Sequence, residues 1–445
     1  MLYNVIWAVN LHYNEMSTIM PKGLLHITAL VMAAMLLCGC VDISRGADMK
    51  FTAGSTEAVN TDVSGIRIIS PDDTTALPDT LPEYAMPDTE PFRERMEEIR
   101  QENGVYGMGI AVFRDGSIIY NDAFGLADTE NEVPCTVNTH FRAASVSKLV
   151  SGLLVMKLCD EEMITLESVL DDAVGLPYSM PSVGDVKLWH LLTHTSGITD
   201  TYLYEWALTN KYSVEYVLKN SLTGMTPGTF YNYTNFGAGT MGAVVEHITG
   251  MFFHDYAERA LFEPLEMDAG YIIDLIDDKE SCAVIYDHDG EVFNVPTWNR
   301  TREYYESFGL GNLYLEAQCE LLITPADLAR IGTALAGNGT VRECGGQRII
   351  SEDSLEKMHN VYIETENFGM GLNVRRYDGN LVPGRVINGH PGNALGAITG
   401  IFYDRSDRTG VVIMTNHSNY AMDSSNGLYR LVSDAVKETY SFFFS

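Results

Sequence analysis

Basic residues are scarce in this sequence: its 445 residues include 29 lysines and arginines against 60 aspartates and glutamates, a formal net charge of −31. Such a chain repels phosphate backbones and anionic lipid surfaces, which excludes a nucleic-acid-binding role. The 7 cysteines form no C-x-x-C pair, and their spacing matches neither a zinc module nor a disulfide framework. No internal repeat is present either. With 46% hydrophobic and 20% charged residues, the chain has the composition of an acidic globular protein.

The N-terminal region contains one mostly apolar run, residues 24–37, which follows Lys22. The run is too short to cross a bilayer, which takes roughly 20 residues, but it has the length of the apolar part of an export signal. The segment Leu37-Cys38-Gly39-Cys40 at its end resembles the lipobox of bacterial lipoproteins. This resemblance implies that Cys40 receives lipid and becomes the mature N-terminus. A buried helix of a cytoplasmic domain is the alternative.

Residues 1–19 contain no lysine or arginine, so we expect translation to start at Met20 or Met16. From 41 to 90, acids and prolines replace large apolar residues, which predicts a solvated tether. The predicted organisation is a signal peptide over 1–39, a lipid anchor and flexible acidic tether over 40–90, and one globular domain over 91–440.

Strand-like patterns occur at both ends of the globular part. Two runs, 105–113 and 117–124, are separated by Arg114-Asp115-Gly116, a hairpin signal. The section from about 145 to 270 is typical of helices and loops. This order predicts one α+β domain whose sheet combines N- and C-terminal segments around a mostly helical insertion. Further elements are a helix over 91–101, strands over 369–374, 386–387, 397–403 and 411–416, and a helix over 421–439.

Ser145 and Lys148 lie three residues apart at the expected start of a helix, and therefore on one helix face. The amine can reach the hydroxyl and help to remove its proton, and a helix N-terminus favours an oxyanion beside the serine. The same spacing recurs at Ser354-Leu355-Glu356-Lys357, but there acidic neighbours indicate a surface helix. The helix after Ser145 is apolar on nearly every side, which indicates a buried one. An N-cap serine followed by a helix lysine is the alternative.

Two further motifs contain polar groups that could take part in catalysis. Among the 24 tyrosines, only Tyr233 is followed by asparagine two positions later, at Asn235. A nearby ammonium favours ionisation of a phenol, which can then act as a general base, although a tyrosine packed in the core is the alternative. The segment Gly389-His390-Pro391-Gly392-Asn393 leads toward the C-terminal strands. Its glycine would let a substrate lie close to a main-chain N–H, whereas a simple loop turn is the alternative.

The three motifs, in this order, resemble the S-x-x-K, Y-x-N and K-T-G or H-x-G marks of the serine hydrolase superfamily of penicillin-binding proteins and class C β-lactamases. The resemblance runs from about 91 to 440. It implies a β-lactamase/transpeptidase-like fold with an antiparallel sheet flanked by helices, and covalent catalysis without a metal or an organic cofactor. Supporting stretches lie at 141–144, 191–198, 264–267, 324–329 and 368–372.

The resemblance also implies roles for the residues of the first two motifs. Ser145 would be the acylated nucleophile, and Lys148 and Tyr233 would be its activating pair. Tyr233 would then direct water at the acyl-enzyme. Asn235 would orient Lys148 and the substrate amide.

In the third motif, His390 takes the place of the family lysine, and the main-chain N–H groups of Asn393 and Ser145 would form the oxyanion hole beside Gly392. Pro391 stands where many relatives have threonine and offers neither a hydroxyl nor an N–H. His390 is mostly neutral near pH 7 if unperturbed. Both departures weaken recognition of the carboxylate of β-lactams and D-Ala peptides, so we expect an esterase or D-amino-acid peptidase rather than a β-lactamase.

The expected function is therefore that of an envelope-anchored serine hydrolase acting on a small-molecule or peptide acyl substrate, with membrane contact only through lipid on Cys40. A lipoprotein of the same fold that binds ligands with little turnover is the alternative, and a cytoplasmic hydrolase is a third possibility. His190 and His194 could share a helix face as metal ligands. No glutamate follows the first as in H-E-x-x-H, so we expect no metal there.

Overall fold

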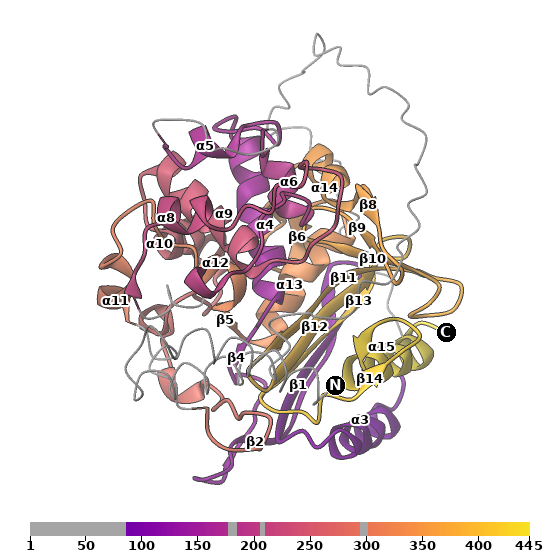
Figure 1. Cartoon of the computed structure of the whole chain (residues 1–445). Coiled ribbons are helices and arrows are strands. Elements are labelled where there is room, and N and C mark those ends of the chain that lie inside the picture. Colours follow the sequence, from indigo (N-terminus) through magenta and orange to yellow (C-terminus); the bar gives the residue numbers. More distant parts are fainter. Residues whose placement is uncertain (1–85, 177–184, 205–209, 294–300) are drawn as a thin grey trace.

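The computed structural model describes residues 86–176, 185–204, 210–293 and 301–445 (Figure 1). Cys40, the signal and nearly all of the tether therefore lie outside the described residues. Within the described ranges, no helix combines the length and apolarity needed to span a membrane.

One antiparallel sheet of nine strands brings the two ends of the domain together, in the order β3-β2-β1-β13-β12-β11-β10-β9-β8. Ile110 of β1 lies opposite Ile413 of β13, which joins the N-terminal and C-terminal groups. The predicted α+β organisation is confirmed. The strands are β1 (Gly107–Arg114), β2 (Ser117–Asp128), β3 (Val133–Pro134), β8 (Ile363–Glu364), β9 (Gly369–Met370), β10 (Arg375–Asp378), β11 (Val386–Ala394), β12 (Ala397–Asp404) and β13 (Thr409–Thr415).

Two hairpins fix the register of the central strands. Asp115 and Gly116 between β1 and β2 have φ values of 50° and 84°, and Leu395 and Gly396 between β11 and β12 have values of 54° and 95°. Positive φ at both central residues defines a type I′ turn, whose twist matches that of the paired strands. The hairpin expected from Arg114-Asp115-Gly116 is therefore confirmed.

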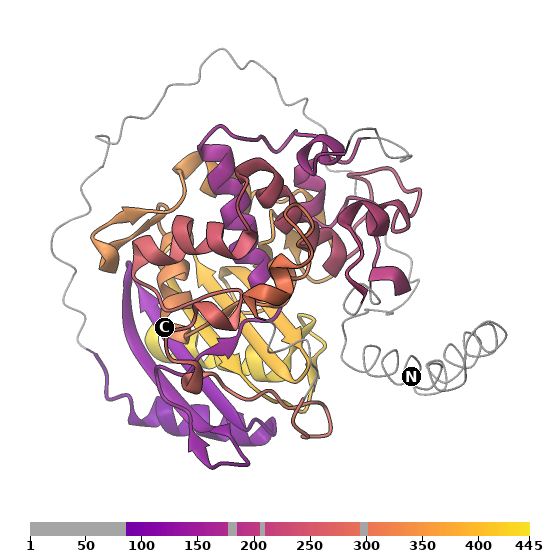
Figure 2. The same ribbon diagram turned by 90° about the vertical axis from the view of Figure 1, so that its left-hand side faces the viewer.

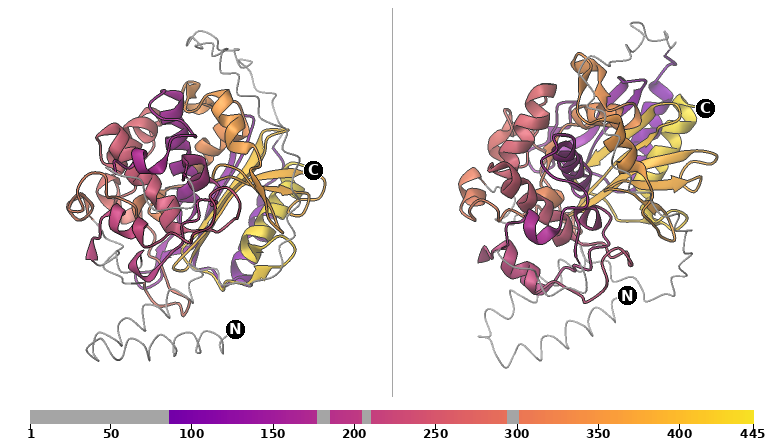
Figure 3. Two further views of the ribbon diagram at one scale, coloured as in Figure 1. Left: turned by 45° about the horizontal axis from the view of Figure 1, so that its top comes forward. Right: turned by 90° about the horizontal axis from the view of Figure 1, so that it is seen from above.

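Helices cover both faces of the sheet (Figures 1 and 2). On one face lie α3 (Glu90–Glu102) and α15 (Arg430–Phe443), where the Phe92 and Phe443 ring centres are 4.8 Å apart. Against the other face lies α13 (Pro325–Ala336), followed by the helical insertion that surrounds α4 (Val146–Asp160), as Figure 3 shows from two more sides. The apolar sequence of α4 explains this central position.

The rest of the insertion consists mainly of short helices and loops, as predicted. One member, α9 (Asn235–Thr249), is as long as α4 and is buried along nearly its whole length. The shorter α-helices of this part and its C-terminal continuation are α5 (Leu170–Ala173), α6 (Leu188–Leu192), α8 (Val214–Lys219), α10 (Phe253–Ala257), α11 (Arg302–Glu306), α12 (Glu316–Cys319) and α14 (Glu352–His359).

Three predicted elements are wrong in extent. The strand expected over 386–387 continues to Ala394, so the third motif lies within β11. The helix expected from residue 421 begins only at Arg430, because residues before it form the β14 (Met422–Asp423) and β15 (Leu428–Tyr429) hairpin. The Asp423 carboxylate accepts local hydrogen bonds that favour a turn over a helix. The strand expected over 369–374 ends at Met370, since Asn373 has φ of 54°.

Candidate active site

Ser145 lies at the entrance of α4, directly after Ala144, which has a left-handed φ of 50°. It occupies the N-cap position, but its hydroxyl makes no capping hydrogen bond. The hydroxyl instead accepts hydrogen bonds from Lys148 Nζ at 3.1 Å and from Tyr233 OH at 2.8 Å. Ser145 keeps 9% of its surface exposed, whereas Lys148 is fully buried.

Lys148 has an acceptor for each of its three N–H groups. Besides Ser145 Oγ, these are Asn235 Oδ1 and the main-chain oxygen of Gln318, both at 2.9 Å. The ammonium therefore stays fixed on the buried side of the serine, where it also lies 5.1 Å from the centre of the Tyr233 ring. Sequence spacing predicted the contact with the serine. It gave no signal for Gln318.

Asp200 orients the start of α9, although the sequence analysis did not single it out. Its carboxylate accepts hydrogen bonds from Thr234 Oγ1 at 2.7 Å and from the main-chain N–H of Asn235 at 2.9 Å and of Phe236 at 2.8 Å. The Asn235 amide also donates to it at 3.2 Å, which leaves Oδ1 turned toward Lys148. Burial raises the pKa of Asp200. The Asp200 carboxylate therefore holds Thr234 and Asn235, the two residues that follow Tyr233.

His194 supports Tyr233 from the other side. Its ring centre lies 4.4 Å from that of Tyr233, its Nδ1 accepts the Thr234 N–H at 3.3 Å, and its main-chain oxygen accepts the Asn232 N–H at 2.8 Å. Burial, followed by the charge of Lys148, lowers the pKa of His194 well below its ordinary value, so the ring is neutral. His190 Nδ1 likewise accepts a main-chain N–H, that of Lys187, at 2.9 Å. Both histidines thus use a ring nitrogen to hold the backbone.

His390 lies on β11 with no exposed surface. Its Nδ1 donates to the oxygen of Pro391 at 2.6 Å, so the remaining nitrogen, Nε2, carries the lone pair in the neutral ring. Burial, together with the charges of Arg375 and Lys148, lowers the pKa of His390 well below its ordinary value. The ring is an acceptor here, and not a cation.

The main-chain N–H of Asn393 faces away from β12. The type I′ turn makes Ala394 and Ala397 a hydrogen-bonded pair, so the next pair, Asn393 and Ile398, is a non-hydrogen-bonded one. On the opposite edge of β11, pairing with β10 ends at Gly389. The Asn393 N–H therefore points away from β12, toward the side of β11 where β10 has already ended and a substrate can lie beside the strand.

Gly392 lets β11 approach the residues that precede Ser145. A Cβ at this position would lie 2.1 Å from Thr399 Oγ1, 2.7 Å from the oxygen of Ala143 and 3.2 Å from Ala144 Cβ. Thr399 Oγ1 itself donates to the same Ala143 oxygen at 2.7 Å, which ties β12 to this point. Only glycine allows so close an approach between the strand and the entrance of α4.

A strap over residues 316–321 runs alongside α4 and is bonded to it at successive positions. Ser151 Oγ donates to the oxygen of Ala317 at 2.7 Å, and Lys148 Nζ to that of Gln318 at 2.9 Å. The Leu321 N–H donates to Ser147 Oγ at 3.2 Å. The strap therefore fixes the position of the Lys148 ammonium relative to the Ser145 hydroxyl.

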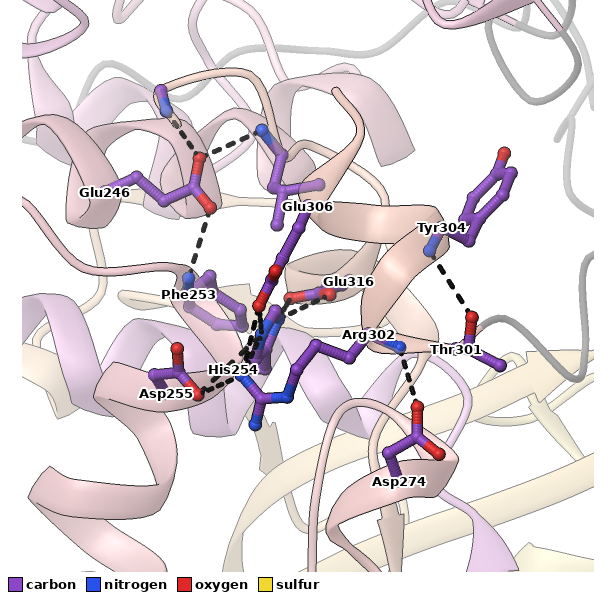
Figure 4. Close-up of polar contacts among 12 residues, drawn as sticks. Glu246, Phe253, His254, Asp255, Asp274, Thr301, Arg302, Tyr304, Glu306 and Glu316 are labelled. Atoms are coloured by element: carbon purple, nitrogen blue, oxygen red, sulfur yellow. Dashed lines mark hydrogen bonds and ion pairs between the residues drawn. The ribbon is translucent and has the colours of Figure 1, made fainter. Parts of the chain in front are cut away.

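The start of this strap is anchored by an ionic cluster in which Glu316 and His254 are buried and the other members are partly exposed (Figure 4). Glu316 accepts a hydrogen bond from His254 Nδ1 at 3.0 Å, and although burial opposes it, this contact raises the pKa of His254. His254, Asp255 and Glu306 are the one group within the described ranges whose donor atoms could together hold a metal ion. Arg302 Nη1 lies among them, 2.6 Å from Asp255 Oδ1 and 3.2 Å from both other donors. A protein cation thus takes the central position.

The second serine and lysine pair is arranged differently. Ser354 Oγ on α14 donates to Asp160 Oδ1 at 2.6 Å, while Lys357 pairs with Asp353 at 2.5 Å and is about half exposed. The two side chains share no contact of the kind seen between Ser145 and Lys148. The interpretation of this copy as part of a surface helix is confirmed.

Comparison with known families adds to this geometry. The model of the beta-lactamase family matches residues 92–434. The chain belongs to the beta-lactamase family. The β-lactamase/transpeptidase-like fold and the expectation of a serine hydrolase of this family are thereby confirmed.

Two related sequences illustrate the relationship. The chain is 27% identical to penicillin-binding protein 4 of Amycolatopsis lactamdurans over 319 residues, which is 68% of this chain and 79% of that protein. It is 30% identical to a β-lactamase of Yersinia enterocolitica over 173 residues. The second match spans only 39% of this chain and 44% of that relative.

Solved structures of low sequence identity share the fold. The octameric penicillin-binding protein homologue from Pyrococcus abyssi is 21% identical, with a TM-score of 0.62 over 80% of this chain and 77% of that chain. A class C β-lactamase mutant is 19% identical, with a TM-score of 0.62 over 80% and 99%. EstCE1, a hydrolase with promiscuous acyltransferase activity, is 19% identical, with a TM-score of 0.61 over 78% and 98%.

Proposed function

We propose that this protein hydrolyses an ester or amide through an acyl-enzyme on Ser145. The observation that carries the proposal is the pair of contacts on the serine hydroxyl, from Lys148 at 3.1 Å and from Tyr233 at 2.8 Å. Ser145 Oγ attacks the acyl carbon as its proton moves to the Tyr233 oxygen, while the Tyr233 hydroxyl gives its own proton to the leaving oxygen or nitrogen. Lys148 keeps its three protons and stabilises the negative charge that develops on the two oxygens. In the second step water attacks the acyl carbon, its proton moves to the Tyr233 oxygen, and Tyr233 returns a proton to Ser145 Oγ, which releases the acid.

The oxyanion formed in each step is stabilised by the main-chain N–H groups of Ser145 and Asn393. The first lies at the N-terminus of α4, where the helix dipole favours negative charge. The Asn393 N–H points away from β12, toward the side of β11 that lies beyond the end of β10. Removing one such donor typically slows acyl transfer by about 100- to 1000-fold. Asn235 assists by holding Lys148 through its Oδ1.

We favour an esterase or a D-amino-acid peptidase activity, carried out in a β-lactamase-like active site. The third motif supports this choice, because its neutral His390 and its Pro391 supply neither the cation nor the hydroxyl of a K-T-G strand. The structures that share the fold include a β-lactamase/D-alanine carboxypeptidase from Pseudomonas syringae, as well as EstCE1.

The test is intact-mass analysis of the chain from residue 41 after incubation with a fluorophosphonate, a penicillin or a 4-nitrophenyl ester. We expect one covalent adduct, lost in Ser145→Ala and retained in Ser354→Ala, the matched serine of the second copy. An adduct that survives in Ser145→Ala would refute Ser145 as the nucleophile. No adduct and no ester turnover in the folded protein would favour a binding module with little turnover.

We also propose that the protein is exported and held on the bacterial envelope by lipid on Cys40. The support is the sequence alone: an apolar run over 24–37 is followed by Cys38-Gly39-Cys40 and then by an acidic tether. Metabolic labelling with an alkyne fatty acid should mark the wild type and Cys38→Ser, and should not mark Cys40→Ser. Equal labelling of the Cys40→Ser variant would disprove the assignment.

A further inference from the structure

Apart from the nucleophile, the Lys148 ammonium has two acceptors, which come from different segments of the chain. Asn235 Oδ1 belongs to the first turn of α9, and the main-chain oxygen of Gln318 belongs to α12; both accept at 2.9 Å. The third acceptor, Ser145 Oγ, forms a new bond during acylation. The place of the ammonium in that step therefore depends on Asn235 and Gln318.

The segment over residues 198–204 contacts both of these acceptor residues. Near its start, Asp200 Oδ2 accepts hydrogen bonds from the main-chain N–H of Asn235 at 2.9 Å and from its side-chain amide at 3.2 Å. At its end, the hydroxyl of Tyr204 donates to Oε1 of Gln318. One short segment thus connects the two supports of the ammonium.

Tyr204 is packed firmly enough to place the Gln318 side chain. Only 7% of Tyr204 and 3% of Gln318 is exposed. The ring centre of Tyr204 lies 5.6 Å from that of Phe236 in α9, and Phe236 in turn packs edge-on against Tyr314, with ring centres 5.3 Å apart. A phenol whose ring is packed in this way has little freedom to move its hydroxyl, so the Gln318 amide is fixed with it.

The main-chain oxygen of Gln318 needs support from outside its own helix. The helix α12 has only 4 residues, which is too short to be stable alone, and the carbonyl groups of a last helical turn have no partner within the helix. Lys148 supplies that partner here. The orientation of this carbonyl therefore depends on tertiary contacts, and the hydrogen bond from Tyr204 is one that acts on the same residue.

We propose that Tyr204 is a positioning residue of the active site, because through the side chain of Gln318 it holds the main-chain oxygen that fixes the Lys148 ammonium. The proposal rests on the acyl-enzyme function proposed above. Since the Tyr204 hydroxyl is bonded to a group of the protein, its loss should slow acylation and leave substrate binding unchanged.

The test is a double-mutant cycle on the acylation rate, with Tyr204→Phe, Gln318→Met and the double variant. Tyr204→Phe leaves a buried amide oxygen without its donor, which is the costly way to break a hydrogen bond. We expect the burst rate at saturating 4-nitrophenyl ester to fall by about 10-fold, with an unchanged ester concentration at half-maximal rate. Gln318→Met breaks the same bond from the other side, so adding Tyr204→Phe to it should cost no further activity.

Tyr314→Phe is the matched control, because it removes a hydroxyl from the same group of packed rings, one that donates to the main-chain oxygen of Tyr212 at 2.8 Å. It should lower thermal stability and keep the wild-type burst rate. The proposal is overturned if Tyr204→Phe keeps that rate, if Tyr314→Phe slows the burst equally, or if Tyr204→Phe slows it as much in the Gln318→Met background as alone. If a thermal melt shows that Tyr204→Phe does not fold, Gln318→Met decides, and a wild-type burst rate in that variant overturns the proposal.

Failure of the hydrolase function would be recognised separately, by the absence of any adduct on Ser145 of the wild type. The crystal structure of Tyr204→Phe then tests the proposal without turnover. A Gln318 oxygen that has moved out of hydrogen-bonding distance from Lys148 Nζ supports it. A contact that stays at the 2.9 Å of the wild type overturns it.

Discussion

Gly392→Ala should separate the two halves of the oxyanion hole. The new methyl group would lie 2.1 Å from Thr399 Oγ1 and 2.7 Å from the Ala143 oxygen. Reaching an ordinary contact of about 3.4 Å would require β11 to move by about 0.7 to 1.3 Å, away from the entrance of α4. Thr399 cannot simply rotate away, because its hydroxyl donates to that same oxygen at 2.7 Å.

A displacement of about 1 Å in a catalytic group can slow a reaction by about 100-fold. We therefore expect acylation to slow by about 100-fold in Gly392→Ala, and the free energy of unfolding to fall by about 1–3 kcal/mol through overpacking. The assay is the pre-steady-state burst of 4-nitrophenol from an ester, read beside a thermal melt.

Gly384→Ala is the matched control for this prediction. Gly384 has φ of 77° in the connection between β10 and β11, and a Cβ there meets nothing within 4 Å. Its replacement should lower stability through backbone strain and leave the burst rate unchanged. A burst of wild-type rate in a folded Gly392→Ala would refute the reasoning that this close approach positions the Asn393 N–H.

Three further outcomes are expected. Asp200→Asn, which loses a carboxylate that fixes the start of α9, should slow acylation at least about 10-fold and lower the free energy of unfolding by about 1–3 kcal/mol. Glu316→Gln should also slow acylation, because the strap that fixes Lys148 loses its anchor, His254. Burial lowers the pKa of His359 to about 4, so between about pH 6.5 and 4 the unfolded chain binds a proton that the folded chain does not. His359 should therefore remove up to about 3 kcal/mol of stability as pH falls through this range, which denaturant unfolding at several pH values measures.

Each of these outcomes has a matched comparison. Asp160→Asn also removes a capping carboxylate, that of α14, and should lower stability without slowing the ester burst. Glu303→Gln, at an exposed position of α11, should leave both stability and acylation near wild type. His359→Gln should show a shallower fall of stability with decreasing pH than the wild type. Equal slopes of stability against pH for the wild type and His359→Gln would contradict the pH prediction. Equal burst rates for Asp200→Asn and Asp160→Asn would contradict the prediction for Asp200, and a wild-type burst rate in Glu316→Gln would contradict the prediction for Glu316.

The sequence predicted features that depend on neighbouring residues. A helix repeat places Ser145 and Lys148 on one face whatever the rest of the chain does, and their contact at 3.1 Å follows from that spacing. Strand alternation and turn residues similarly predicted β1, β2, β12 and β13. Where competing local hydrogen bonds were involved, as at Asp423 before α15, the periodic pattern extended the helix too far.

What only the tertiary structure decided is which distant residues complete the site. Asp200, Gln318 and Arg375 belong to no motif of the sequence analysis, and each meets the site from a separate segment of the fold. A hydrogen bond to a main-chain oxygen, such as that of Gln318, leaves no trace in residue type. Folding places the guanidinium of Arg375 beside the ring of Tyr233. The next residue, Arg376, is identical in type but pairs with Asp378 nearer the surface. The sequence by itself determined that Ser145 and Lys148 meet, because a helix repeat places them on one face, and the packing of distant segments determined which other groups surround this pair.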